Sequence, residues 1–181
     1  ITIVIALSEL AIKPNYCLLT AILVLDHLKQ NALESKSTVI DNASLYLFVQ
    51  DKKMRRAAIV SPVRTPVGKF MGSLSALPAG ELGAIAIKAL MARTKCDPER
   101  IDDVVFAQGY ASGEAPCIGR WSALAAGLPV TVPGMHVDRR CGSGLQAVID
   151  AAMMVQTGVA DAVIAGGAES MSNVEYYSTD M

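Results

Sequence analysis

Short apolar runs alternate with longer helix-like segments along the chain from Met54 onward. The strand-like runs cover residues 57–60, 104–107, 135–138 and 162–165, and the helix-like segments cover 78–93, 118–126 and 143–157. The last run contains no polar residue, as expected for a strand covered on both faces. This alternation predicts an α/β layered fold, in which helices cover a mainly parallel or mixed sheet.

Local signals mark where these elements begin and end. We expect residues 61–66 to form a loop, because each proline disfavours helical geometry in the residue before it. Gly127 is expected to stop the second helix, and Gly158 to cap the third. The first helix is amphipathic, with one apolar stripe made of Leu82, Ile85, Ala86, Ala89 and Leu90.

Residues 1–53 differ in composition from the rest of the chain. All 14 glycines lie at Gly68 or later, every arginine lies at Arg55 or later, and Met54 looks like a natural start. Three interpretations stay open for this leader: a non-native extension, an accessory helix pair with helical periodicity from Tyr16 to Leu33, or a targeting segment. Five acids and no arginine argue against a mitochondrial transit peptide. We assign the leader no function.

Residues 54–181 are interpreted as one domain. The chain stops at Met181, soon after the fourth strand-like run and within a segment that reads as a loop. Compact domains rarely end in this way, so we expect the domain to be truncated at its C-terminus.

Composition excludes several classes of protein. The chain is 52% hydrophobic with a mean hydropathy of +0.38, which supports a substantial core. A formal net charge of −1 gives no electrostatic case for binding nucleic acid or an anionic membrane. The longest apolar run, 17–25, is too short to span a bilayer, and no signal-peptide pattern precedes it.

The four cysteines are widely scattered, without a CxxC pair, and the chain has two histidines. This pattern predicts no disulfide framework and no metal site, and it indicates reduced thiols in a cytoplasmic compartment. We interpret Cys96 and Cys117 as bystanders.

Cys141 is the leading candidate for a functional residue. It follows a strand-like run, precedes Gly142-Ser143-Gly144, and is expected to stand at the N-terminus of a long helix. That position favours an anion such as a thiolate, which is both the nucleophilic form and the group that forms covalent intermediates. A buried structural cysteine is the alternative, and local spacing leaves both interpretations open.

The neighbours of Cys141 supply some of the groups that such a nucleophile needs. Gly142 and Gly144 permit unusual φ values and leave room for a substrate carbonyl beside the backbone N–H of Cys141, a candidate oxyanion contact. His136 is poorly placed as a base, since five residues of extended chain span about 16 Å and end on the opposite face. We therefore expect a nucleophile without its proton-transfer partner.

The two arginines before Cys141 have three open interpretations. Arg139 and Arg140 attract an acidic substrate, pair with Asp138 or Asp150, or sit at a subunit contact.

Three segments resemble landmarks of the thiolases, specifically the acetyl-CoA acetyltransferases. They are residues 61–70 (SPVRTPVGKF), 141–147 (CGSGLQA) and 166–172 (GGAESMS), and their order and spacing also agree with the family. The resemblance runs from about Met54 to Met181. It implies a thiolase fold of two similar βαβαβαββ halves, of which this chain holds most of the first.

The resemblance also implies a reaction. Cys141 accepts an acyl group from acyl-CoA as a thioester, and a second acetyl-CoA attacks it to give acetoacetyl-CoA or, in reverse, a 3-ketoacyl-CoA is thiolysed. Coenzyme A thioesters are then substrates, with no permanently bound cofactor. The full enzyme is expected to be a homodimer or homotetramer.

Two departures from the thiolase pattern qualify these expectations. Asp138 stands where thiolases commonly carry asparagine. The activating histidine, the second cysteine and most of the coenzyme A loop of the family belong to a later part of the chain. We therefore expect this chain to be inactive alone and to expose apolar surface. The alternatives are a β-ketoacyl carrier-protein synthase-like enzyme, or a non-catalytic fold remnant or interaction module.

Overall fold

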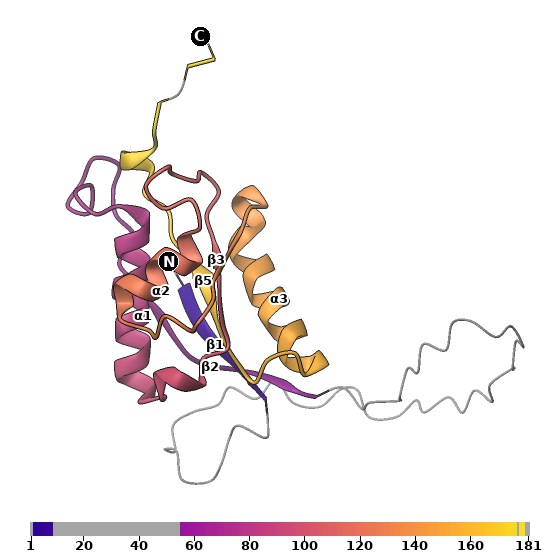
Figure 1. Ribbon diagram of the computed structural model, residues 1–181. Helices are drawn as coiled ribbons and strands as arrows, with labels where there is room; N and C mark the ends of the chain where they lie inside the picture. The colour runs from indigo at the N-terminus through magenta and orange to yellow at the C-terminus, as the bar shows by residue number, and fades with distance from the viewer. Residues whose placement is uncertain (1, 9–54, 177, 180–181) are drawn as a thin grey trace, which may run out of the picture.

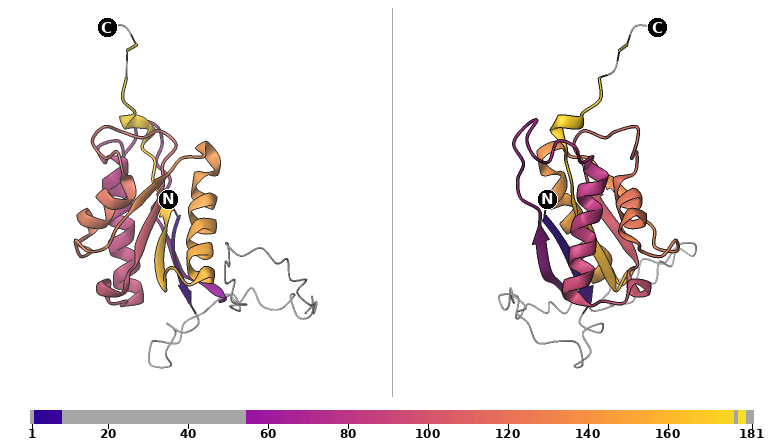
Figure 2. Two further views of the ribbon diagram at one scale, coloured as in Figure 1. Left: turned by 45° about the vertical axis from the view of Figure 1, so that its right-hand side comes forward. Right: turned by 90° about the vertical axis from the view of Figure 1, so that its left-hand side faces the viewer.

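The computed structural model describes residues 2–8, 55–176 and 178–179. The interpretations of residues 9–54, including the helical periodicity from Tyr16 to Leu33, lie outside these ranges. The described residues form three layers, with α1 and α2 on one face of a sheet and α3 on the other (Figure 1). Two further views show the same arrangement (Figure 2).

A five-stranded mixed sheet forms the middle layer, with strand order β2-β1-β5-β3-β4. The strands are β1 (Thr2–Ser8), β2 (Ala57–Arg64), β3 (Asp103–Ala107), β4 (Met135–Val137) and β5 (Ala162–Gly167). Strands β3, β4 and β5 are parallel, whereas β1 runs antiparallel to both β2 and β5. The α/β fold with a mixed sheet and covering helices is confirmed.

Strand β1 comes from the segment to which the sequence assigned no role. Its backbone pairs with β2 on one side and β5 on the other, so that Ile5 lies opposite both Val60 and Ile164. Both partners are more than 50 residues away along the chain, and strand pairing at that separation has no local sequence signal. The pattern Thr-Ile-Val-Ile is nevertheless typical of strands.

Strand β2 is longer than predicted: residues 61–64 of the expected 61–66 loop belong to the strand, and the loop begins at Thr65. The strand continues to Arg64 through a β-bulge: two steps along β1, from Ile3 to Ile5, lie opposite three steps along β2, from Val63 to Val60. Ser61 takes up the extra residue with a φ of 46°. The proline that follows it is tolerated because β2 lies at the edge of the sheet.

The three helices match their predicted positions. They are α1 (Ala79–Thr94), α2 (Ile118–Ala126) and α3 (Ser143–Thr157). Gly127 and Gly158 end α2 and α3 in the left-handed conformation, with φ values of 88° and 78°. Pro78 is the N-cap of α1, one residue before its first helical residue.

The buried face of α1 is rotated from the predicted stripe. Ile85 and Ala89 are exposed, whereas Gly83 and Ile87 are buried beside the predicted leucines. The reason is that α2 packs closely against α1: a Cβ added at Gly83 would lie 2.6 Å from the Ser122 hydroxyl oxygen. Gly83 therefore belongs to the face of α1 that contacts α2, and a pattern of hydrophobic residues does not reveal such a glycine.

The core has one part on each face of the sheet. Phe106 and Ile164 point toward α1 and α2, while Val105 and Val163 point toward α3, and all four are fully buried. This alternation follows from the period of two residues in a strand. The outer side of α3 exposes an apolar stripe made of Leu145, Ile149 and Met153.

Gly119 tests the packing of α2 on the sheet. A Cβ at this position would lie 2.3 Å from the Met135 carbonyl oxygen and 2.6 Å from that of Val104, so backbone must move. We expect Gly119→Ala to lower the free energy of unfolding by about 2 kcal/mol, measured by urea denaturation. Gly144→Ala is the matched control, because its Cβ meets nothing within 4 Å. Equal unfolding midpoints for both variants would contradict this packing.

Candidate functional site

The carboxyl ends of β3, β4 and β5 meet at one edge of the sheet, because these three strands are parallel. An open cavity of about 840 Å³ lies there. Its lining residues fall within the segments 65–75, 107–109, 140–148 and 167–172, together with Leu82. All three segments that carry the thiolase resemblance therefore contribute to a single cavity.

Cys141 lies in a 3₁₀ turn, η3 (Arg140–Gly142), directly before α3. Its side chain is exposed and lines the cavity. The interpretation of Cys141 as a buried structural cysteine is therefore wrong. Its place before the first turn of a 15-residue helix exposes the thiol to the positive end of the helix dipole.

The glycines after Cys141 keep space open without unusual backbone geometry. Gly142 has a φ of −88°, and Gly144 lies within α3, so the expectation of unusual φ at these residues is wrong. A Cβ at Gly144 would meet nothing within 4 Å, and one at Gly142 only the Arg139 Cβ at 4.0 Å. The left-handed residue of the turn is instead Arg140, with a φ of 51°.

Ser143, which the sequence did not single out, stabilises the turn through its buried hydroxyl group. It is only 3% exposed. Its hydroxyl accepts the Arg139 backbone N–H at 2.6 Å and donates to the Arg140 carbonyl oxygen at 2.7 Å. A serine at the first position of a helix, next to glycines, is the signal that could have identified this role.

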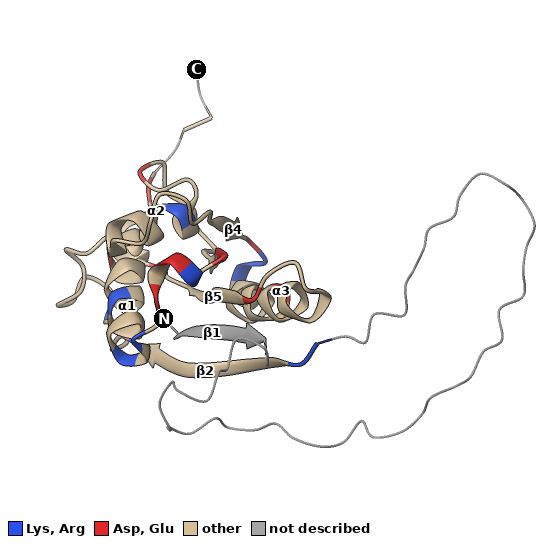
Figure 3. Ribbon diagram, turned by 60° about the horizontal axis from the view of Figure 1, so that its bottom comes forward, with Lys and Arg blue, Asp and Glu red and all other residues tan. Residues whose placement is uncertain are grey.

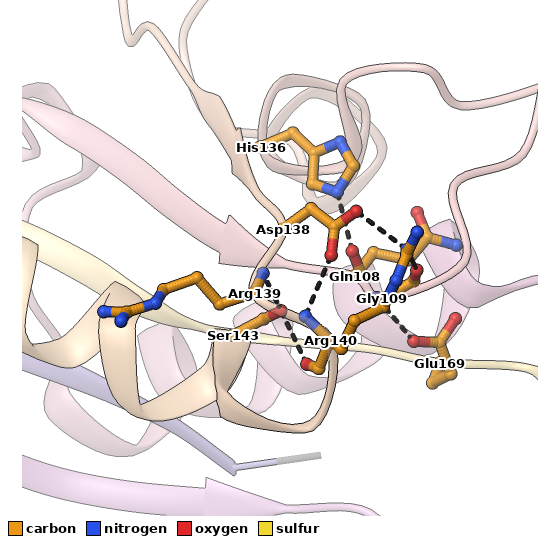
Figure 4. Close-up of polar contacts among 8 residues, drawn as sticks. All are labelled: Gln108, Gly109, His136, Asp138, Arg139, Arg140, Ser143 and Glu169. Carbon is orange, nitrogen blue, oxygen red and sulfur yellow. Dashed lines mark hydrogen bonds and ion pairs between the residues drawn. The ribbon is translucent and has the colours of Figure 1, made fainter.

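Arg140 connects the turn to the loop after β3 (Figure 4). Its Nη1 lies 2.8 Å from Asp138 Oδ2, and its backbone N–H donates to Asp138 Oδ1 at 2.9 Å. The guanidinium also donates to the Gly109 carbonyl oxygen and lies 5.6 Å from the centre of the Tyr110 ring. Figure 3 shows acidic and basic residues next to each other directly after β4, where this ion pair lies.

Arg139 points elsewhere. Its guanidinium donates to Gln146 Oε1, and the amide of Gln146 in turn donates to Asp150 at 2.6 Å. Of the pairings left open by the sequence, the structure therefore has the one between Arg140 and Asp138.

Gln108 and Glu169 both line the cavity, and each has one buried, unpaired side-chain oxygen. Glu169 Oε2 accepts the Gly109 backbone N–H at 2.7 Å. Glu169 Oε1 and Gln108 Oε1 are buried without a hydrogen-bond partner among the residues described. Both residues line the cavity, but these two oxygens are themselves buried, so they are unpaired acceptors beneath its surface.

His136 contacts the backbone of the loop after β3. Its Nε2 lies 2.8 Å from the Gln108 carbonyl oxygen, and because a carbonyl only accepts, Nε2 carries the proton in this contact. It is the one histidine in the described part of the chain, and it does not line the cavity.

The other two described cysteines differ from Cys141 in burial and partners. Burial raises the pKa of the Cys96 thiol; Arg100 partly offsets this rise and Asp97 adds to it. The Cys117 thiol is half-buried and donates to the Gly134 carbonyl oxygen at 3.2 Å. Neither lines the cavity.

Two kinds of feature are absent from the described residues. No group of three or more histidine, cysteine, aspartate or glutamate side chains in these ranges is arranged to hold a metal ion. No helix in the same ranges has the length and hydropathy needed to cross a membrane.

Comparison with known proteins defines the class. The family model "Thiolase, N-terminal domain" matches residues 57–181. The chain belongs to the thiolase family.

Individual relatives agree with this assignment. The chain is 46% identical over 119 residues to an acetyl-CoA acetyltransferase of Cupriavidus necator, covering 66% of this chain and 30% of that protein. It is 44% identical over 119 residues to a cytosolic acetyl-CoA acetyltransferase of Gibberella zeae, with the same coverage. The crystal structure of the Bacillus anthracis acetyl-CoA acetyltransferase superposes with a TM-score of 0.63 at 37% identity, covering 65% of this chain and 30% of that one. The chain thus spans about 30% of the length of these proteins.

Alkylation tests the difference among the thiols. In a Cys17→Ser background, we expect iodoacetamide at pH ~7.5 to modify Cys141 before Cys96 and Cys117. Of these three described cysteines only Cys141 is exposed, and the raised pKa of Cys96 leaves less thiolate. Peptide mass spectrometry over time measures the three rates. Modification of Cys96 or Cys117 as fast as Cys141 would contradict the described exposure.

Proposed function

We propose that this chain carries the acyl-accepting part of a thiolase-type acyltransferase, with Cys141 as the nucleophile. The single observation that carries the proposal is the exposed Cys141 thiol at the cavity where all three thiolase-like segments meet. A cavity of about 840 Å³ lies within the range of small-molecule sites. The family match over residues 57–181 supports thiolase chemistry rather than that of a β-ketoacyl carrier-protein synthase.

The proposed reaction has two steps. The Cys141 thiolate attacks the acyl-CoA carbonyl, the C–S bond to coenzyme A breaks, and coenzyme A leaves as a thiol after taking a proton. The α-carbanion of a second acetyl-CoA then attacks the acyl-Cys141 thioester and expels the Cys141 thiolate, giving acetoacetyl-CoA. Thiolysis of a 3-ketoacyl-CoA is the reverse. A thiol suits both steps, since it is a good nucleophile and a good leaving group.

The chain's own residues would supply the first step. Gly142 and Gly144 leave room for the thioester beside Cys141, and the Cys141 backbone N–H is the proposed oxyanion contact. The second step needs a base for the acetyl-CoA α-carbon, and the described histidine does not line the cavity. We therefore propose that the chain alone does not complete the reaction.

Several wider features belong to the same proposal. Coenzyme A thioesters are substrates, and no cofactor is permanently bound. The complete enzyme acts in the cytoplasm as a homodimer or homotetramer. The name of the Gibberella zeae relative, which includes the word cytosolic, and the scattered cysteines support the compartment.

Acetyl transfer from acetyl-CoA tests the first step. We expect incubation of the chain with acetyl-CoA to add one acetyl group, which peptide mass spectrometry places on Cys141, and hydroxylamine to remove it as expected for a thioester. Cys141→Ala should abolish the modification, whereas the matched control Cys117→Ala should retain it. An unmodified Cys141, or equal acetylation of all cysteines, would favour the non-catalytic module.

A further inference from the structure

Arg140 has a backbone conformation that residues other than glycine rarely adopt unless further contacts stabilise it. Its φ of 51° places it in the left-handed region, immediately before Cys141. Lys95 shares this conformation, but as the C-cap of α1, where left-handed residues are usual. Arg140 instead opens the turn that presents the thiol, so other contacts must stabilise it.

The contacts of Arg140 come from both its backbone and its side chain. Asp138 accepts the backbone N–H with one carboxylate oxygen and pairs with the guanidinium through the other, at 2.9 and 2.8 Å. The same guanidinium donates to the Gly109 carbonyl oxygen and lies against the Tyr110 ring. One side chain therefore connects the turn before α3 to the loop after β3.

Glu169, in the loop after β5, adds a third loop to this connection. It accepts the Gly109 N–H at 2.7 Å, while the carbonyl oxygen of Gly109 accepts Arg140 (Figure 4). A Cβ added at Gly109 would lie 3.3 Å from Glu169 Oε2 and 3.6 Å from the Arg140 Cα. The loops after β3, β4 and β5 are thus joined at a single residue, Gly109, through its N–H and its carbonyl oxygen.

Charge gives Arg140 a second role. Asp138 carries a carboxylate three residues before Cys141 in the sequence, and an unpaired negative charge on the same turn would repel an anionic reagent. Arg140 forms an ion pair with this carboxylate, whereas Arg139 donates to Gln146 on α3. The two arginines are adjacent in sequence, but only one compensates Asp138.

We propose that Arg140 is the positioning residue of Cys141: it holds the thiol-bearing turn against the loop after β3, which Glu169 joins to the loop after β5, and it neutralises Asp138 on the same turn. This inference rests on the acyl-accepting role proposed for Cys141. We test it by alkylation, which needs no acyl transfer, so the two proposals can fail separately.

The experiment compares two reagents that differ in charge. The rate of Cys141 modification by iodoacetate, which is anionic, is divided by the rate with neutral iodoacetamide, and peptide mass spectrometry follows both at low ionic strength. A change in exposure or mobility alters both rates together, so the ratio reports the local charge.

We expect Arg140→Met to lower this ratio about three-fold or more, because the Asp138 carboxylate is left unpaired. Adding Asp138→Asn to Arg140→Met should restore the ratio to within about two-fold of the parent, and Arg140→Lys should retain it. Arg139→Met is the matched control, with an expected change below about two-fold.

Positioning has its own readout. The iodoacetamide rate alone should change in Arg140→Met and stay at the parent value in Arg139→Met, because only Arg140 holds the turn. If Arg140→Met fails to fold, Arg140→Gly replaces it, since glycine adopts the left-handed conformation without strain. Equal ratios for the Arg139 and Arg140 variants, or no restoration by Asp138→Asn, would overturn the inference.

Discussion

The parallel pairing of β3 with both β4 and β5 is the constraint on which the site depends. Parallel strands send their carboxyl ends to the same edge of the sheet, so the three loops that follow them must meet. Two of these loops bear the residues of the thiolase-like segments, and the long loop after β2 closes the third side of the cavity. The position of the site therefore depends first on strand direction, and individual side chains then determine its details.

The turn that carries Cys141 shows how the chain secures an exposed nucleophile. The buried Ser143 hydroxyl joins two backbone groups within the turn, and Arg140 joins the turn to the neighbouring loop. Both fix the backbone on either side of Cys141 while its side chain stays exposed at the cavity. The thiol is held through its neighbours, which leaves its own surface available to a substrate.

Local signals in the sequence were sufficient for the helices and their ends, as at Gly127 and Gly158, because a helix depends on contacts within one turn. Features that depend on distant chain could not be predicted. The bulge at Ser61 exists because β2 pairs with a remote strand, and Gly83 is buried because α2 packs against it. Cys141 was predicted from its motif, but the contacts of its turn come from loops brought together only by the sheet.

A crystal structure of the chain after reaction with acetyl-CoA tests the central claim most directly. The account predicts an acetyl group bonded to Cys141 Sγ, lying inside the cavity beside Gly144, with Arg140 still left-handed and paired with Asp138. An acetyl group absent from Cys141, or a modified Cys141 turned out of the cavity, would contradict it.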